Sequence, residues 1–183
     1  MKGQYDAAVF DGSDELLARA VSQYNKPLIF FINSFMRNIQ DAEDVVADTF
    51  LELLMRKPRF REEASFKTYL FTCARNNAID RIRKSAKKKT ISADELQESA
   101  DTLSVSPEDS AVLSERDQKL RRTVAALPEE YREVIILLYF EGMSCDEAAQ
   151  VLRKSKKQMY NLSHRARQAI KEALEKDGFD YEN

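Results

Sequence analysis

Long polar side chains recur along a predicted helix near the C-terminal end of the chain. They follow one another at three- and four-residue steps and are Lys157, Tyr160, Asn161, His164 and Gln168. Residues spaced in this way share one face of an α-helix. Because long donors and acceptors can reach base edges in the major groove, this face predicts contact with duplex DNA.

Cations surround that face. They are Arg153, Lys154, Lys156, Lys157, Arg165, Arg167 and Lys171, and no acidic residue occurs from position 151 to position 171. Lys and Arg hold backbone phosphates, which position a protein on DNA without reading its sequence. The alternative is a solvated basic helix, although such helices usually interleave Glu with Lys.

Two capping boxes mark the helices that must position these residues. Ser144 precedes Glu147 by three residues, and Ser155 precedes Gln158 by the same step. In each pair the Ser hydroxyl can accept a bond from a free N–H at a helix start. The pattern predicts one helix over about 146–152 and a second that starts after Ser155 and runs to about 175. The three residues 153–155 join them, which is the length of turn found in a helix-turn-helix.

Apolar stripes support this arrangement. In the second helix the stripe consists of Met159, Leu162, Ala166, Ile170 and Leu174. Two more helices are predicted upstream to close the core: one from Pro107 to about position 126, with Leu113, Leu120 and Val124 inward, and one from Pro128.

The composition suggests a helix-rich protein, and together with the caps, apolar stripes and charge along the chain it predicts an all-α fold. That fold consists of two small helical domains joined by an acidic linker, the C-terminal one a four-helix helix-turn-helix domain. The 183 residues are 43% hydrophobic and 33% charged, with 4 Gly and 4 Pro. Cys73 and Cys145 lie far apart and there is one His, which argues against a metal site. Because each Cys lies beside or within an apolar helical pattern, we expect both to be buried or partly buried thiols. No nucleotide loop or nucleophile–base pair suggests an enzyme or a cofactor. With no signal peptide and no apolar run of membrane length, we expect a cytoplasmic protein.

Charge is distributed unevenly along the chain. The net charge of −2 and the pI near 5.6 alone argue against nucleic acid, but positions 75–89 and the helix-turn-helix are strongly basic. The segment between them is acidic through Asp94, Glu95, Glu98, Asp101, Glu108, Asp109, Glu115 and Asp117. A basic, acidic, basic order indicates two nucleic-acid-binding regions more strongly than the total charge excludes them.

The N-terminal half is predicted to be helical. One helix is expected over about 14–23, Pro27 starts or kinks a second one that is apolar over most of its surface, and Asp41 caps a third that ends before Pro58. Along the third helix Asp44, Asp48 and Glu52 step by four. The residues alone leave two interpretations open, a solvated face or a docking surface for a basic partner.

A long helix is predicted from Phe66 to about position 87. Its buried stripe is expected to be Phe66, Leu70, Ala74, Ala78 and Ile82. Cations, amides and aromatics occupy its other faces and the preceding loop: Arg59, Phe60, Arg61, Lys67, Tyr69, Arg75, Asn76, Asn77, Arg81, Arg83 and Lys84. Such a mixture suits single-stranded nucleic acid, since aromatics stack on bases and cations follow the backbone. The alternative is a basic face whose aromatics belong to the core.

Two blocks at this spacing resemble one family. DAEDVVADTF with FKTYLFTCARNNAIDRIRK, and LPEEYREVIILLYFEGMSCDEAAQVL with SHRAR, are similar to the two conserved domains of bacterial RNA polymerase sigma factors of the extracytoplasmic-function (ECF) type. The resemblance divides the chain into a tail (1–13), a region 2-like domain (14–88), a linker (89–106), a region 4-like helix-turn-helix domain (107–177) and a second tail (178–183).

The resemblance also implies roles and partners. Promoter DNA, core RNA polymerase with its clamp coiled coil and flap, and an anti-sigma protein would be the partners. The clamp would bind the segment that holds Asp41, Glu43, Asp44, Asp48 and Glu52. Residues 59–84 would hold the single-stranded minus-ten element, and the helix after Ser155 would read the minus-thirty-five duplex. The acidic linker, with Asp94, Glu95, Glu98 and Asp101, would imitate a phosphate backbone inside the polymerase.

The chain departs from the family pattern in its reading helix and turn. Tyr69 replaces the usual Trp, and Arg153 stands where the turn commonly has Gly. The reading helix begins with Gln158, Met159 and Tyr160 instead of a Thr-Val-Lys-like run. Leu162 and Ser163 are exchanged relative to the usual pattern. Two rival functions therefore stay open. One is a stand-alone helix-turn-helix regulator, and the other is a sigma-like protein that sequesters polymerase or an anti-sigma factor.

Overall fold

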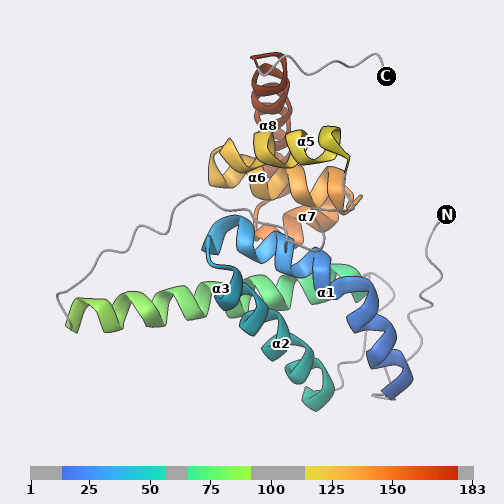
Figure 1. Cartoon of the computed structure of the whole chain (residues 1–183), viewed down its shortest axis with the longest axis vertical. Helices are drawn as coiled ribbons and strands as arrows, with labels where there is room; N and C mark the ends of the chain where they lie inside the picture. Colours follow the sequence, from blue (N-terminus) through green and yellow to red (C-terminus); the bar gives the residue numbers. More distant parts are fainter. Residues whose placement is uncertain (1–13, 57–65, 92–113, 177–183) are drawn as a thin grey trace.

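Helices make up the described part of the chain, which comprises residues 14–56, 66–91 and 114–176 of a computed structural model. The N-terminal group contains α1 (Asp14–Met36), α2 (Ile39–Arg56) and α3 (Phe66–Ile91). The C-terminal group contains α5 (Glu115–Ala126), α6 (Glu129–Ile135), the π-helix η1 (Ile136–Phe140), α7 (Cys145–Leu152) and α8 (Lys156–Lys176). The all-α prediction is confirmed (Figure 1).

The first predicted helix and the helix expected from Pro27 form one continuous helix. α1 carries Pro27 in its interior, and Figure 1 shows it bending along its length. Proline removes one backbone donor and its ring crowds the preceding turn, so a helix that continues through it bends. Burial of Tyr24, Leu28, Phe31 and Ile32 holds both halves in place. The prediction of a kink is therefore confirmed, and a start at Pro27 is wrong.

A two-residue corner joins α1 to α2. Arg37 takes the left-handed conformation with φ of 53°, which ends α1. Asn38 then caps α2, because its side-chain oxygen accepts from the Asp41 N–H at 3.1 Å. The prediction that Asp41 is the cap was wrong by three residues, since Asp41 lies in the first turn of the helix.

The stripe of α3 is buried over most of its length. Leu70, Ala74 and Ala78 are fully buried and Phe66 is partly buried, but Ile82 is 42% exposed. The prediction for Ile82 was wrong because α3 extends beyond the helices that cover it, as Figure 1 shows. Phe71, which lies beside the predicted stripe, is fully buried.

In the C-terminal group, α5 begins after Ser114, whose hydroxyl accepts from the Asp117 N–H at 3.1 Å. The predicted start at Pro107 and Leu113 lie outside the described residues. Of the other two positions expected to face inward, Val124 is fully buried and Leu120 is partly buried. α6 continues into η1, where the Glu141 N–H donates to the Ile136 carbonyl at 2.9 Å.

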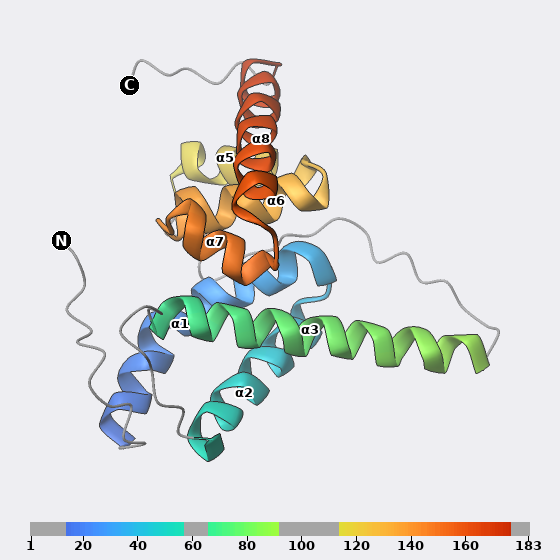
Figure 2. The ribbon, with the colours of Figure 1, turned by 180° about the vertical axis from the view of Figure 1, so that it is seen from behind.

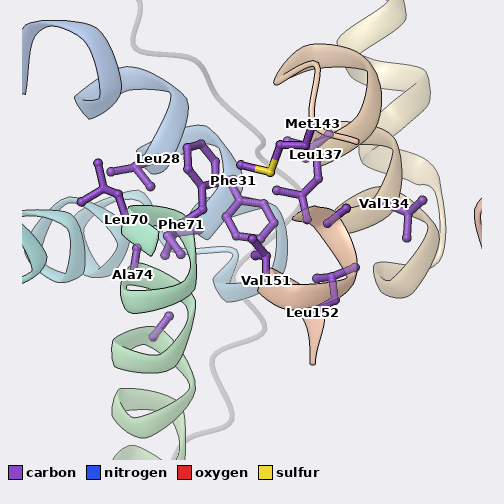
Figure 3. Packing of buried hydrophobic residues seen from close by; sticks show 14 of the residues in the cluster. Leu28, Phe31, Leu70, Phe71, Ala74, Val134, Leu137, Met143, Val151 and Leu152 are labelled. Carbon is purple, nitrogen blue, oxygen red and sulfur yellow. The ribbon is translucent and has the colours of Figure 1, made fainter. Parts of the chain in front are cut away.

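The two helical groups pack directly on one another. α7 packs against α3 and α6 packs against α1 (Figure 2). Figure 3 shows the buried side chains of the two groups meeting in one cluster, with Phe31 and Phe71 on one side and Leu137, Met143 and Val151 on the other. None of the helices in the described ranges has the length and apolar character to cross a bilayer.

Candidate nucleic-acid interface

The turn between α7 and α8 is fixed by the two capping boxes that the sequence predicts. Ser144 Oγ accepts from the Glu147 N–H, and the Glu147 carboxylate accepts from the Ser144 N–H at 2.9 Å. At the second box the Gln158 side chain accepts from the Ser155 N–H at 2.8 Å, and Gln158 N donates to Ser155 Oγ at 3.3 Å. Each box satisfies donors that a helix start leaves free.

One face of α8 is buried and the opposite face is open. The buried residues Met159, Leu162 and Ala166, with Leu174 further along, confirm the predicted apolar stripe, and Ile170 packs against it. The five residues of the predicted reading face are all exposed: Lys157, Tyr160, Asn161, His164 and Gln168. We call these five residues the reading face. Tyr160 is 65% exposed although it is a large aromatic residue, so its ring is not packed in the hydrophobic core.

Arg153 adopts the left-handed conformation that the turn requires. Its φ is 53° and its ψ is 42°, and it caps the C-terminal end of α7. Glycine is the usual residue at such a position because it lacks a Cβ. The turn therefore keeps the left-handed conformation that glycine usually adopts at this position. The Cβ of Arg153 makes that conformation sterically unfavourable.

We expect Arg153→Gly to raise the free energy of unfolding by about 1 kcal/mol. A residue other than Gly costs roughly 1–2 kcal/mol in the left-handed conformation, and the substitution removes that cost. Glycine also increases the conformational entropy of the unfolded chain, which offsets part of the gain. Urea denaturation followed by circular dichroism measures the change. Gln150→Gly, at an exposed helical position of α7, is the matched control and should lower stability by about 1 kcal/mol. If both glycines destabilise equally, Arg153 is not strained.

The cations around the reading face are not all free. Lys154 Nζ lies 3.0 Å from a Glu130 carboxylate oxygen, and Lys156 Nζ lies 2.8 Å from an Asp146 oxygen. Both carboxylates come from outside the acid-free stretch, so sequence spacing does not reveal these pairs. Within the described residues Arg153, Lys157 and Arg165 are exposed and have no ion pair.

Two predicted single-strand contacts on α3 are instead bound by acids of the C-terminal group. Arg75 Nε donates to Glu133 Oε1 at 2.9 Å, and Lys67 Nζ lies 2.8 Å from Glu141 Oε2. Beside them, Thr68 Oγ1 lies 3.4 Å from Glu147 Oε1. The guanidinium and the ammonium therefore hold the two helical groups together in this arrangement.

Other predicted residues of α2 and α3 pair with one another. Arg81 donates to Asp41 Oδ1 at 2.7 Å and to Asp44 Oδ2 at 2.8 Å. In the same way Asn77 donates to Glu52 Oε2 at 3.0 Å. These contacts join two sets of residues that the resemblance assigns to different partners. On α2, Glu43 and Asp48 are exposed, and within the described residues they have no ion pair.

Tyr69 is half-buried beside Cys73. Burial first, and then a hydrogen bond with the Cys73 thiol, raise the pKa of Tyr69 to about 12. Burial also raises the pKa of the Cys73 thiol. Cys73 is partly buried, as expected, whereas Cys145 is exposed, so the prediction of a buried or partly buried thiol was wrong there. It failed because Cys145 opens α7 on its outer side.

The remaining predicted cations of α3 stay open. Arg83 and Lys84 are exposed, with Arg83 3.6 Å from Asp80, and Asn76 is partly exposed. Arg59, Phe60 and Arg61 lie outside the described residues, as do the linker acids Asp94, Glu95, Glu98 and Asp101. Among the described residues there is no group of His, Cys, Asp and Glu that could hold a metal ion.

Glu133 and Glu141 are site residues that the sequence analysis missed. Glu133 is buried between the two helical groups, and this burial raises its pKa although Arg75 lowers it. The sequence offers little local signal, because Glu133 is the last residue of the charged run EEYRE that opens α6, and the apolar run begins only at Val134.

The comparisons with known proteins agree with this geometry. The model of Sigma-70 region 2 matches residues 20–88, and the model of Sigma-70 region 4 matches residues 117–170, together about two thirds of the chain. The first match lies on α1–α3 and the second on α5–α8. The chain belongs to the ECF group of the sigma-70 family.

Relatives of this sigma factor match it over nearly its whole length. It is similar to the ECF RNA polymerase sigma factor SigW of Bacillus subtilis (strain 168), with 26% identity over 89% of this chain and 91% of the relative. Among solved structures, this chain is similar to the sigma factor RpoE in complex with the anti-sigma factor NepR from Bartonella quintana, with a TM-score of 0.69 and 24% identity. The match covers 88% of this chain and 98% of the other chain, and it supports the fold. CnrH in complex with the cytosolic domain of CnrY matches with a TM-score of 0.58 and 27% identity, covering 91% and 92%.

Proposed function

We propose that this sigma factor binds core RNA polymerase and directs it to promoters through three surfaces: the outer face of α2, the cationic side of α3, and the reading face of α8. The observation that carries the proposal is the exposed reading face on a capped helix-turn-helix, in a chain whose two helical groups match regions 2 and 4. A reading helix of this kind enters the major groove. Under this proposal the matched regions correspond to two functional domains, at 14–88 and 107–177.

The outer face of α2 combines acids with exposed apolar side chains. Leu51 is 55% exposed and Met55 is 78% exposed, and both follow Asp48 on the same side of the helix. Exposed apolar residues beside unpaired acids suit a partner that offers cations around an apolar seam. We assign the polymerase clamp to this face, with Glu43 and Asp48 as its free charges.

We expect Asp48→Lys to weaken binding to core polymerase at least about tenfold, because the change places a like charge against a basic partner. Fluorescence anisotropy of labelled sigma factor titrated with core measures the dissociation constant. Glu15→Lys is the matched control, since Glu15 is also exposed and makes the same change in net charge. Equal binding of the two variants would remove α2 from the polymerase interface.

In the matched complex from Bartonella quintana the sigma factor RpoE is bound to the anti-sigma factor NepR. We propose that a protein of this class also holds this sigma factor inactive. Both helical groups would then contribute to its binding surface, and the apolar parts of α1 would be accessible only after the groups separate.

Run-off transcription tests the proposed function. Purified core polymerase is incubated on sheared DNA from the source genome, with and without this protein. New discrete transcripts that share two short upstream motifs are the expected result. Binding to core without transcripts would favour a protein that sequesters polymerase, and a gel shift on bare duplex without core binding would favour a stand-alone regulator.

A further inference from the structure

Two ion pairs cross the boundary between the helical groups and engage the cations of α3. Arg75 and Glu133 are 58 residues apart in sequence, and Lys67 also donates to the Glu141 main-chain oxygen, 74 residues away. An arginine fork donates to a carboxylate and to a phosphate in the same planar geometry, and a lysine ammonium binds either as a point charge. Glu133 and Glu141 therefore occupy positions that backbone phosphates would otherwise take.

The arrangement covers most of both cations. The side chain of Arg75 is 16% exposed and that of Glu133 is 4% exposed, while that of Lys67 is 27% exposed. A phosphate that binds the Arg75 guanidinium in the same way must displace the Glu133 carboxylate. The other two surfaces stay open in the same state, since Asp48 on α2 and Asn161 on α8 are exposed.

The boundary combines the ion pairs with apolar packing that opening must expose, because Phe31 and Phe71 meet Leu137, Met143 and Val151 in one buried cluster. Beside this cluster the ring centroid of Phe30 lies 5.6 Å from that of Phe140, and Arg121 stacks 4.6 Å from the Phe30 centroid. The pKa of Glu133 is raised, because the effect of burial exceeds the lowering by Arg75. The charged carboxylate is therefore less stable at this position than in water. Separation rehydrates Glu133 and returns Arg75 to solvent, which offsets part of the lost packing.

We propose that Glu133 and Glu141 are internal substitutes for promoter phosphates, which hold the free sigma factor in a closed state that blocks single-strand binding by Arg75 and Lys67. This inference rests on the proposed function. Core polymerase can still dock on the outer face of α2 in the closed state, so docking precedes opening. The single-stranded promoter then competes directly with the two glutamates.

Zero-length cross-linking tests the closed state in the unmodified protein. A carbodiimide joins an amine to a carboxylate that it contacts, so the free full-length chain should give an amide bond between Lys67 and Glu141, identified by peptide mass spectrometry. Adding core polymerase and promoter DNA should reduce its yield several-fold. Absence of the bond in the free protein, or an unchanged yield in the transcribing complex, would overturn the proposal.

The Glu133→Gln/Glu141→Gln variant tests the competition. We expect it to bind a single-stranded non-template promoter oligonucleotide about tenfold more tightly than the wild type without polymerase, by fluorescence anisotropy. The slope of log affinity against log salt should steepen by about 1.4, as expected for two more phosphates on a single strand. The control is Glu115→Gln/Glu172→Gln, which makes the same charge change at exposed positions outside the boundary.

The outcomes separate this inference from the proposed function. Equal tightening in both double variants would indicate net charge alone and would overturn the internal competition. Transcription by the wild type without the Lys67–Glu141 cross-link would keep the sigma function and remove the closed state. The cross-link without transcription would keep the closed state and remove the function that it is proposed to regulate.

Discussion

Phe71→Ala is expected to lower the free energy of unfolding by about 3–5 kcal/mol, the usual cost of removing a buried aromatic ring. Phe71 is fully buried, and its ring centroid lies 5.5 Å from that of Phe31, which is also fully buried. The loss adds a cavity to the lost burial because α1 and α3 cannot collapse around the site. Urea denaturation with a circular dichroism readout measures it.

Tyr160→Ala is the matched aromatic control for that experiment. Tyr160 is exposed on the reading face, so we expect its removal to change stability by less than about 0.5 kcal/mol. If Phe71→Ala costs no more than Tyr160→Ala, the cluster shared by α1 and α3 contributes little to the stability of the fold.

Asn161→Ala is expected to weaken binding to the upstream duplex element by about 1–3 kcal/mol, or roughly 5- to 160-fold, because an amide on the reading face can bond a base edge in two places. The loss should depend on sequence and shrink on a duplex in which the contacted base pair is changed. Anisotropy on labelled duplexes, with the holoenzyme and at fixed salt, measures both.

Arg165→Ala gives the contrasting result on the same helix. Arg165 is exposed beside the reading face, and we expect it to contact phosphate, so its loss should weaken binding about equally on all duplexes and reduce the salt slope by about 1. If Asn161→Ala also weakens all duplexes equally, the helix holds the backbone and base reading occurs elsewhere.

The sequence by itself determined the helix-turn-helix. The two capping boxes depend on hydrogen bonds between residues three positions apart, and the stripe from Met159 to Leu174 depends on helical periodicity. Both are local properties that spacing records directly. For the same reason the exposure of Tyr160 and Asn161 followed from the sequence, since the buried face of α8 fixes the open one.

Only the tertiary structure decided which charges are free. Arg75 finds Glu133, Lys67 finds Glu141, and Arg81 finds Asp41 and Asp44, over separations that local spacing does not record. Ile82 likewise keeps its place in the α3 stripe, yet it is 42% exposed, because the described helices cover it only in part. Ion pairs and burial between distant segments depend on how whole helices pack, whereas caps and stripes depend on a few adjacent residues.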